Sequence, residues 1–460
     1  MKKQIKNSIL GFAVLFGVFS CAPEDWIDYS INNDPDAPSN VPMSLILPAV
    51  QQSVAYQLNG NNTVRTTALW MQQFDGVARQ SFTETRYQLT PADVNNVFDD
   101  IYSEILINCK IIIDQAEGSS PHFSGVAKVL TALSLGVATD LFGDIPYSEA
   151  LQGSDNLTPA YDSQESIYQT IFSLLDSAIS DLSQSDNVFP LAGDLMYDGD
   201  VSKWIKAAYS LKARHYIQLS NKSASAYSDA LAAAELGFFD LDDDLALTFD
   251  SDDKSPFYQF MDQRGDIVMG GKLYDILYDL PGIYWDPRID FYFDDFFGAG
   301  GSVAGSENAD ASLPGTFLTA EDATVYLMSV AELYFIKAEA HAALGNTADA
   351  SLNLQNGITR SMLKSGADFD DIREAYILDA IYFAQDTSLE NIITHKYIDG
   401  FGTNQPYADW RRTGFPQLDL AIGAVIPQIP TRFPYPQDEL NYNSANVPSV
   451  SITDKVWWDE

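Results

Sequence analysis

Apolar residues recur at helical spacing over much of the chain. The clearest stripe starts after Ser124, which we place as an N-cap, and continues at every third or fourth position until Gly143. The same spacing predicts further helices at residues 92–117, 164–182, 201–220, 224–236, 325–344, 348–363, 372–383 and 389–397. Helices joined by short polar turns predict an all-α fold.

Two of the predicted helix pairs share a weak internal repeat. Lys212 and Ala213 precede Leu219 at the offset at which Lys337 and Ala338 precede Leu344, and an alanine-rich helix follows each. Residues 338–358, AEAHAALGNTADASLNLQNGI, resemble a tetratricopeptide unit. Such units stack to bury their apolar faces, so we predict a tetratricopeptide-like scaffold of helix pairs. Ordinary antiparallel helix pairs are the alternative.

Helical spacing is lost between residues 240 and 320. Asp, Gly, Pro and aromatic residues crowd together there, and GAGGSVAGSENADAS is typical of a loop. After Gly402 proline and aromatic residues dominate again. We therefore predict one domain over 44–460, with a helical part (44–239), a loop-rich, aromatic-rich ligand-binding part (240–320), a second helical part (321–402) and an irregular tail (403–460).

The first residues are typical of an export signal. Three lysines precede an apolar core at residues 9–19, which is too short to span a bilayer. The sequence VFSC, ending at Cys21, resembles a bacterial lipobox, in which the cysteine is lipidated. We predict a signal peptide at 1–20, a lipid anchor on Cys21 and an acidic, proline-rich tether at 21–43. Ordinary signal cleavage after Ser20 is the alternative.

The net charge of the chain restricts which molecules it can bind. The chain has 26 Lys and Arg against 64 Asp and Glu, a formal net charge of −38. Such a surface repels phosphate backbones, which argues against nucleic acid as a partner. It equally argues against a basic contact with anionic lipid, so attachment to a membrane has to come from the lipid anchor.

Motifs for catalysis are missing from the sequence. It contains no G-x-S-x-G, H-E-x-x-H or G-K-[ST], and its four histidines share no metal-ligand spacing. The run DLDDD at 240–244 alternates carboxylates, but Leu245 and Ser251 stand where an EF-hand has glycine and glutamate. We predict a binding protein without a cofactor and a solvated acidic loop at 240–244. Calcium at that loop and a surface glycoside hydrolase are the alternatives.

Four stretches together indicate a family. They are ATDLFGDIPYSEAL (138–151), MSVAELYFIKAEAHAALG (328–345), YADWRRTGFPQL (407–418) and IPTRFPYPQDELNYN (429–443). In this order, behind a lipobox, they resemble the SusD/RagB family of nutrient-binding outer-membrane lipoproteins of Bacteroidetes, and its SusD-like branch most closely.

The resemblance implies a helical fold of tetratricopeptide-type pairs with a variable, loop-rich ligand portion. It also implies a SusC-like TonB-dependent β-barrel as partner and a lipid-anchored position on the cell-surface side of the outer membrane. The implied ligand is an oligosaccharide, with a peptide as the alternative. The protein would bind it without making or breaking a covalent bond. A purely structural or adhesive helical-repeat lipoprotein is the remaining alternative.

A protein that binds sugars needs flat aromatic faces and a few polar groups. Residues 240–320 concentrate aromatic side chains outside helical spacing, so we place ligand contacts at Tyr284, Trp285 and Arg288, which follow a Pro-Gly turn. Trp70 and Tyr87, which flank the polar stretch at 72–86, are the second choice.

Core packing competes with ligand binding at every one of these rings. It is the preferred interpretation for Trp70, Phe293 and Phe297. Arg411 and Arg412 are expected to tie the tail to helix carboxylates and not to hold a ligand.

Overall fold

The computed structural model describes residues 41–60, 62–279, 286–367 and 381–460. The predicted signal peptide, Cys21, nearly all of the predicted tether and most of the predicted helix at 372–383 lie outside these residues. Residues 43–460 form one compact unit.

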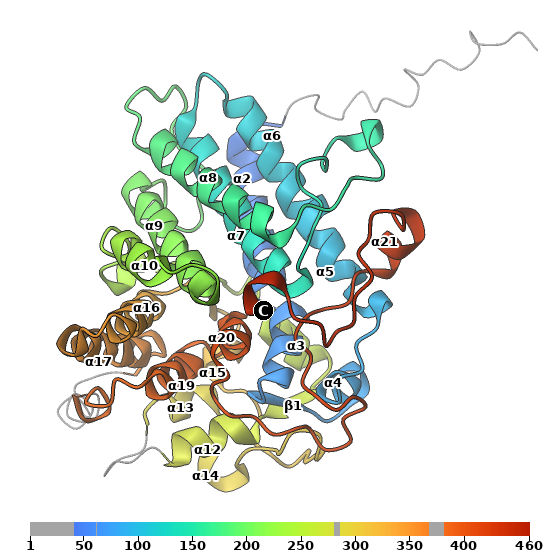
Figure 1. The fold of residues 1–460 in the computed structure, drawn as a ribbon, viewed down its shortest axis with the longest axis vertical. Coiled ribbons are helices and arrows are strands. Elements are labelled where there is room, and N and C mark those ends of the chain that lie inside the picture. The colour runs from blue at the N-terminus through green and yellow to red at the C-terminus, as the bar shows by residue number, and fades with distance from the viewer. Residues whose placement is uncertain (1–40, 61, 280–285, 368–380) are drawn as a thin grey trace, which may run out of the picture. The chain divides into compact units, whose positions relative to one another are not determined.

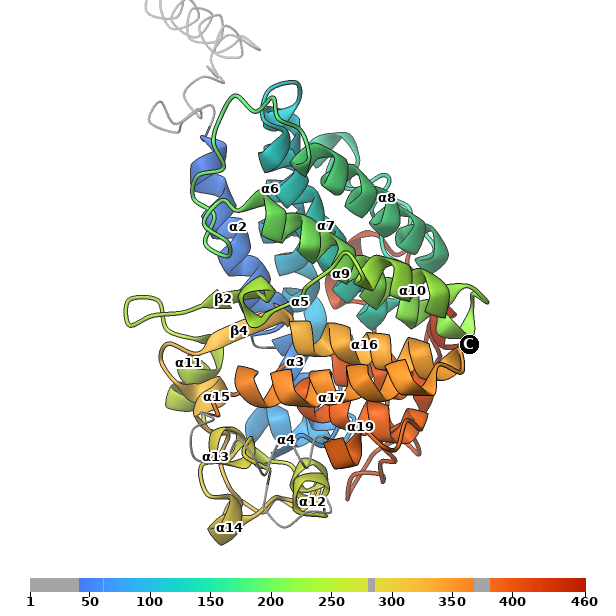
Figure 2. The same cartoon turned by 90° about the vertical axis from the view of Figure 1, so that its left-hand side faces the viewer.

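Long helices that pack in consecutive pairs build most of this unit. Helix α7 packs on α8, α9 on α10 and α16 on α17, and the pairs contact one another through α8 with α9 and α10 with α16. Figures 1 and 2 show the three pairs side by side. This stacking confirms the predicted all-α fold with tetratricopeptide-like pairs. The long helices are α2 (Met43–Leu58), α3 (Asn62–Trp70), α6 (Ile107–Ala116), α7 (Pro121–Phe142), α8 (Gln164–Leu182), α9 (Val201–Gln218), α10 (Ala226–Ala234), α16 (Val330–Ala343), α17 (Thr347–Lys364), α19 (Leu389–Asp399) and α20 (Gln405–Thr413).

Helix α7 is the core of the unit. It is long and apolar enough to cross a membrane, but almost all of it is buried inside the protein, so it is a core helix. Its N-cap is Ser120, followed by Pro121, whose fixed φ suits the first helical position. The predicted N-cap at Ser124 was therefore wrong: Ser124 lies inside the helix, and its hydroxyl donates to Asp181. Gly143, with φ +79°, ends the helix as predicted.

Short segments connect and cover the long helices. The run predicted as one helix at 92–117 consists of four successive segments, η2 (Pro91–Val94), α5 (Asn95–Asp100), η3 (Ile101–Leu106) and α6. The other connecting segments are α4 (Arg79–Thr85), α11 (Pro256–Gln263), α12 (Gly271–Asp279), α13 (Ile289–Tyr292), α14 (Phe296–Ala299), α15 (Thr316–Thr319), α21 (Gln437–Tyr442), η4 (Gly153–Asp155), η5 (Leu219–Asn221), η6 (Leu241–Asp243) and η7 (Trp457–Asp459).

Two small antiparallel sheets join distant parts of the chain. Strand β1 (Phe74–Gly76) pairs with β3 (Ile267–Met269), and β2 (Leu245–Thr248) pairs with β4 (Thr324–Met328). The predicted helix at 325–344 was wrong over its first residues. The sequence TVYLM is rich in β-branched and aromatic residues and pairs with β2, and α16 starts only after the N-cap Ser329.

The acidic run at 240–244 is only partly solvated. Asp243 is buried, and its carboxylate accepts from Lys206 at 2.8 and 2.9 Å and from the backbone N–H groups of Phe239 and Asp240. This carboxylate closes the η6 turn and fixes it to α9. Asp240 and Asp242 are exposed.

The C-terminal tail is fastened to the helical body by buried polar contacts. Arg412 pairs with Glu339 of α16 and with Asp409, which confirms the expected tie to helix carboxylates. Arg411 uses carbonyls instead, donating to Asp140 O at 2.6 Å and to Thr431 O at 3.0 Å.

Candidate functional site

The predicted ligand contacts after the Pro-Gly turn are only partly within the described residues. Tyr284 and Trp285 lie outside them. Arg288 is fully buried, and its Nε and Nη2 donate to the carboxylate of Asp286 at 2.9 and 2.5 Å. Its Nη1 donates to Ser361 of α17 at 2.9 Å. Arg288 therefore ties the start of α13 to α17, which contradicts its expected position at a ligand surface.

The second choice, Trp70 and Tyr87, is buried as well. The indole Nε1 of Trp70 donates to Glu84 O at 3.1 Å, and its ring packs edge-on against Tyr407 and Phe433. The hydroxyl of Tyr87 accepts from the N–H of Ala421. Core packing of Trp70 is confirmed. Neither ring offers a face to solvent, which contradicts the expectation of a stacking surface here.

Exposed aromatic rings do occur in the 240–320 region, at positions that the sequence did not nominate as ligand contacts. Tyr278 of α12 is 64% exposed and Phe297 of α14 is 62% exposed. The predicted core packing of Phe297 was wrong, whereas that of Phe293 is confirmed. Tyr278 stacks on Tyr274 with ring centroids 5.8 Å apart, and Tyr274 lies 4.3 Å from Phe296.

Phe296 in turn contacts Phe297 edge-on at 5.2 Å. We call this row of four rings, Tyr274, Tyr278, Phe296 and Phe297, the aromatic platform. Its two ends are exposed and Phe296 in its middle is buried, so the exposed rings are held in place from below.

Helical spacing creates the platform on α12. Leu273 and Leu277 are four residues apart and buried, and Tyr274 and Tyr278 form the neighbouring stripe one position later. On α14 the N-cap Asp295 accepts from Gly298 N at 2.9 Å, which closes a single turn with Phe296 inward and Phe297 outward. The spacing of Tyr274 and Tyr278 could have been found in the sequence if 271–279 had been read as a helix.

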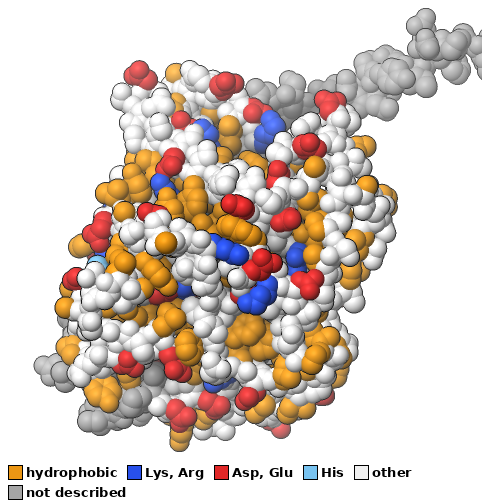
Figure 3. Space-filling model, viewed as in Figure 1, with side chains coloured by type: hydrophobic (Ala, Val, Ile, Leu, Met, Phe, Trp, Pro, Cys, Tyr) orange, Lys and Arg blue, Asp and Glu red, His pale blue; other side chains and the backbone are white. Residues whose placement is uncertain are grey.

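Carboxylates accompany the rings. Asp275 and Asp279 lie on α12, and burial together with the neighbouring charge of Asp279 raises the pKa of Asp275. Along the lower edge of the face in Figure 3, where α12 and α14 lie, acidic and hydrophobic side chains are intermixed. Flat rings flanked by hydrogen-bond acceptors suit a hydroxyl-rich ligand whose C–H face can stack.

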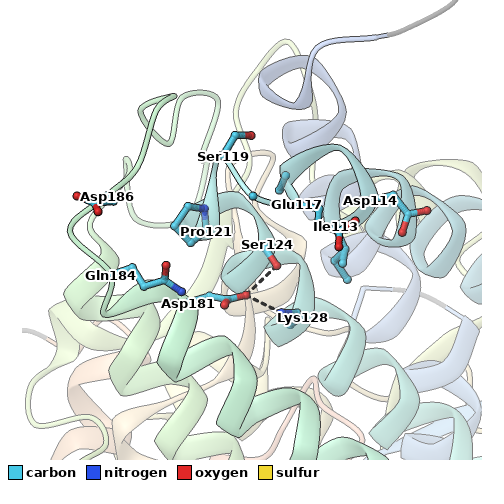
Figure 4. A pocket seen from close by; sticks show the side chains of 12 residues that line it. Ile113, Asp114, Glu117, Ser119, Pro121, Ser124, Lys128, Asp181, Gln184 and Asp186 are labelled. Atoms are coloured by element: carbon cyan, nitrogen blue, oxygen red, sulfur yellow. Dashed lines mark hydrogen bonds and ion pairs between the residues drawn. The ribbon is translucent and has the colours of Figure 1, made fainter.

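A groove of about 530 Å³ lies at the ends of α6, α7 and α8 (Figure 4). Inside it Lys128 and Ser124 both contact one carboxylate oxygen of Asp181, at 2.6 and 2.8 Å. The described residues that line it include no aromatic ring. This groove is polar and acidic, and it offers nothing on which a sugar ring could stack.

Metal ligation finds no support in the described part of the chain. It contains no group of three His, Cys, Asp or Glu side chains placed to hold a metal ion. Within the run at 240–244, where calcium is the alternative, the carboxylate of Asp243 is paired with Lys206.

Comparisons with known proteins agree on one family. Residues 35–436 match the model of the SusD-like family, described as "Starch-binding associating with outer membrane". No curated protein matches the chain significantly. A SusD/RagB family structure from Bacteroides thetaiotaomicron is 25% identical, with a TM-score of 0.74 over 91% of this chain and 99% of that chain.

Two chitin-binding proteins are similarly close in structure. One is 25% identical, with a TM-score of 0.77 over 91% of this chain and 100% of that chain. The other, a SusD homolog from Flavobacterium johnsoniae, is 23% identical, with a TM-score of 0.73 over 91% of this chain and 97% of that chain.

Proposed function

The chain belongs to the SusD-like family, and on that premise we propose that it captures an oligosaccharide at the outer membrane by stacking sugar rings on the aromatic platform. Members of this family are nutrient-binding proteins associated with the outer membrane. The observation that supports a glycan ligand is that the rings of Tyr278 and Phe297 are exposed. Each is held in place by a neighbouring ring, that of Tyr274 or Phe296.

The proposed mechanism needs no bond to be made or broken. Binding raises the concentration of nutrient at the cell surface, and a SusC-like TonB-dependent barrel takes the nutrient over from the protein. A lipid on Cys21 holds the protein at the outer membrane. A glycoside hydrolase would need two carboxylates at a defined separation on either side of a bound sugar.

Substitution at the platform tests the proposal. Tyr278→Ala and Phe297→Ala each remove one exposed ring and, with it, on the order of 1.4 kcal/mol of binding free energy. We therefore expect about tenfold weaker binding of the recognised glycan. Calorimetric titration of the full-length protein in detergent against maltotriose, cellotriose, triacetylchitotriose and short peptides measures this.

Tyr442→Ala is the matched control, because Tyr442 on α21 is 77% exposed and lies outside the platform. Equal affinity of the Tyr278, Phe297 and Tyr442 variants would reject the platform as the binding surface. Binding of peptides alone would favour the peptide alternative, and turnover of a sugar by the pure protein would favour the hydrolase.

A further inference from the structure

The carboxylates beside the aromatic platform have no cationic partner. Asp275 and Asp279 follow Tyr274 and Tyr278 by one position on α12, so they form the next stripe around the helix. Both carboxylates are exposed, and neither makes an ion pair within the described residues. Two unbalanced negative charges therefore lie along the edge of the tyrosine pair.

Two further carboxylates lie on the α14 side of the platform. Asp294 accepts from Ser312 Oγ and from Leu313 N, both at 2.7 Å. Asp295 accepts from a backbone N–H inside α14 at 2.9 Å. These donors carry no charge, so they leave the negative charge of both carboxylates in place. In the sequence of α12, of α14 and of the two positions before α14, Lys272 is the one basic residue against four carboxylates.

Repulsion within this set already affects Asp275. Burial raises the pKa of its carboxyl, and the charge of Asp279 raises it further, against the opposing charge of Lys272. Like charges four residues apart on a helix repel each other. A cation between Asp275 and Asp279 would relieve that repulsion, so this edge of the platform favours a positively charged group.

The rings of the platform attract the same kind of group. The planes of Tyr274 and Tyr278 differ by 14°, so the two rings present nearly parallel faces. The face of an aromatic ring attracts an ammonium or a guanidinium group. Elsewhere in the protein such a face is occupied, as where the guanidinium of Arg360 lies 4.4 Å from the ring centre of Tyr334. Among the described residues, no lysine or arginine lies over Tyr274 or Tyr278.

We infer that the aromatic platform selects amino sugars with a free, cationic amino group, such as oligomers of glucosamine. The C–H face of the sugar stacks on Tyr278, and its ammonium lies against Asp275 and Asp279, which determine the specificity. The inference rests on the proposed function, because it uses the same surface, and it adds the class of sugar. A lysine side chain carries the same charge but lacks the flat C–H face that the rings stack on.

Two trisaccharides that differ only in their amino groups test the inference. The glucosamine trimer has three free amines, and triacetylchitotriose has the same amines acetylated. Both are titrated into the full-length protein in detergent at about pH 6, where a free amine is charged. We expect the glucosamine trimer to bind about tenfold more tightly, because the exposed opposite charges and the ring faces each contribute a little. The preference should shrink between about 20 mM and about 0.5 M NaCl, since salt screens exposed charges.

The double variant Asp275→Asn with Asp279→Asn removes the charges and keeps the size of the side chains. We expect its affinities for the two trisaccharides to lie within about twofold of each other, since the remaining stacking does not distinguish an amine from its acetylated form. The matched control is Asp242→Asn with Asp252→Asn, which removes two exposed carboxylates outside the platform and should keep the preference.

The outcomes separate this inference from the proposed function. If Tyr278→Ala weakens binding of both trisaccharides and the wild type binds them equally, the platform stands as a glycan surface and the inference is rejected. If the preference survives in the Asp275 and Asp279 double variant, another acidic surface causes it, and the inference is again rejected. If Tyr278→Ala binds both trisaccharides like wild type, the proposed function falls and this inference falls with it.

Two further results would overturn the inference alone. Trilysine that binds as tightly as the glucosamine trimer would show that charge without a sugar ring is sufficient. No binding of the glucosamine trimer at about 10 mM, under conditions in which Tyr278→Ala weakens the binding of a neutral trisaccharide, would show that the platform does not take the cationic sugar.

Discussion

The carboxylate of Asp244 accepts a hydrogen bond from Val330 N, at the first turn of α16. Burial raises the pKa of this carboxyl from its ordinary value of 3.8 to about 7, against the opposing effects of the Val330 hydrogen bond and of Lys364. Between about pH 4 and 7 the folded protein therefore keeps a proton that the unfolded chain has released. The stability contributed by Asp244 falls as pH rises through this window, and it is lowest above pH 7.

Asp244→Asn removes this titration and keeps an oxygen that can accept from Val330 N. We expect the Tm of the variant relative to wild type to rise by about 2–4 °C between pH 5 and pH 8. Calorimetric scans at several pH values measure it, with exposed Asp242→Asn as the control. A Tm difference that stays constant with pH would contradict the assignment.

Two aromatic residues show why local sequence patterns do not determine whether a side chain is buried or exposed. Trp70 and Phe297 are both aromatic residues beside polar stretches, yet one is buried between Tyr407 and Phe433 and the other is mostly exposed. The neighbours that decide this are more than 300 residues away for Trp70 and adjacent in the sequence for Phe297. Local patterns cannot carry information about distant partners, so the sequence favoured core packing of Trp70 without identifying Tyr407 and Phe433 as the residues that bury it.

Among the elements, the last turn of the tail, η7, is held by a buried carboxylate of α7. Asp140 accepts from the indole of Trp458 at 2.9 Å, from the hydroxyl of Tyr168 at 2.7 Å and from the amide of Gln218 at 3.0 Å. Burial raises the pKa of Asp140, which marks the cost of keeping this charge away from water. Three donors from α8, α9 and η7 offset that cost.

Trp458→Phe keeps the packing and removes one of these donors. We expect a loss of about 1–3 kcal/mol in the free energy of unfolding, because Asp140 stays buried with one partner fewer. Trp457→Phe is the matched control: its neighbouring indole makes no hydrogen bond among the described residues and is only partly buried. Urea denaturation compares the two, and equal losses would show that the Trp458 N–H is unimportant.

Elements with strong local signals were predicted well. Residues 164–182 form α8 with the predicted bounds, because the N-cap Ser163 and an apolar stripe both lie in the local sequence. Residues 325–328 were predicted as helix and form strand β4, because their pairing with β2 depends on a segment that is distant in the sequence. Helix α12, which carries the platform, was missed inside a region that composition marks as a loop.

At the scale of the whole molecule, the proposed membrane anchor is a lipid on Cys21, which lies outside the described residues. Cys21→Ser is expected to release the full-length protein from the membrane fraction into the soluble one, because stable anchoring requires the acyl chains. Fractionation of cells, followed by detergent phase separation, measures this. Cys109→Ala should leave the protein in the membrane fraction, since the Cys109 thiol is buried in α6. Unchanged partitioning of Cys21→Ser would refute the anchor.

Asp140 and Trp458 are 318 residues apart in the sequence. During synthesis α7 emerges early, but two partners of Asp140 are made only near the end of the chain: Arg411, which donates to its backbone carbonyl, and Trp458, which donates to its carboxylate. The core around α7 therefore closes late, and contacts of such long range slow its completion. The order in which the segments leave the ribosome thus sets a lower limit on when this protein can become fully folded.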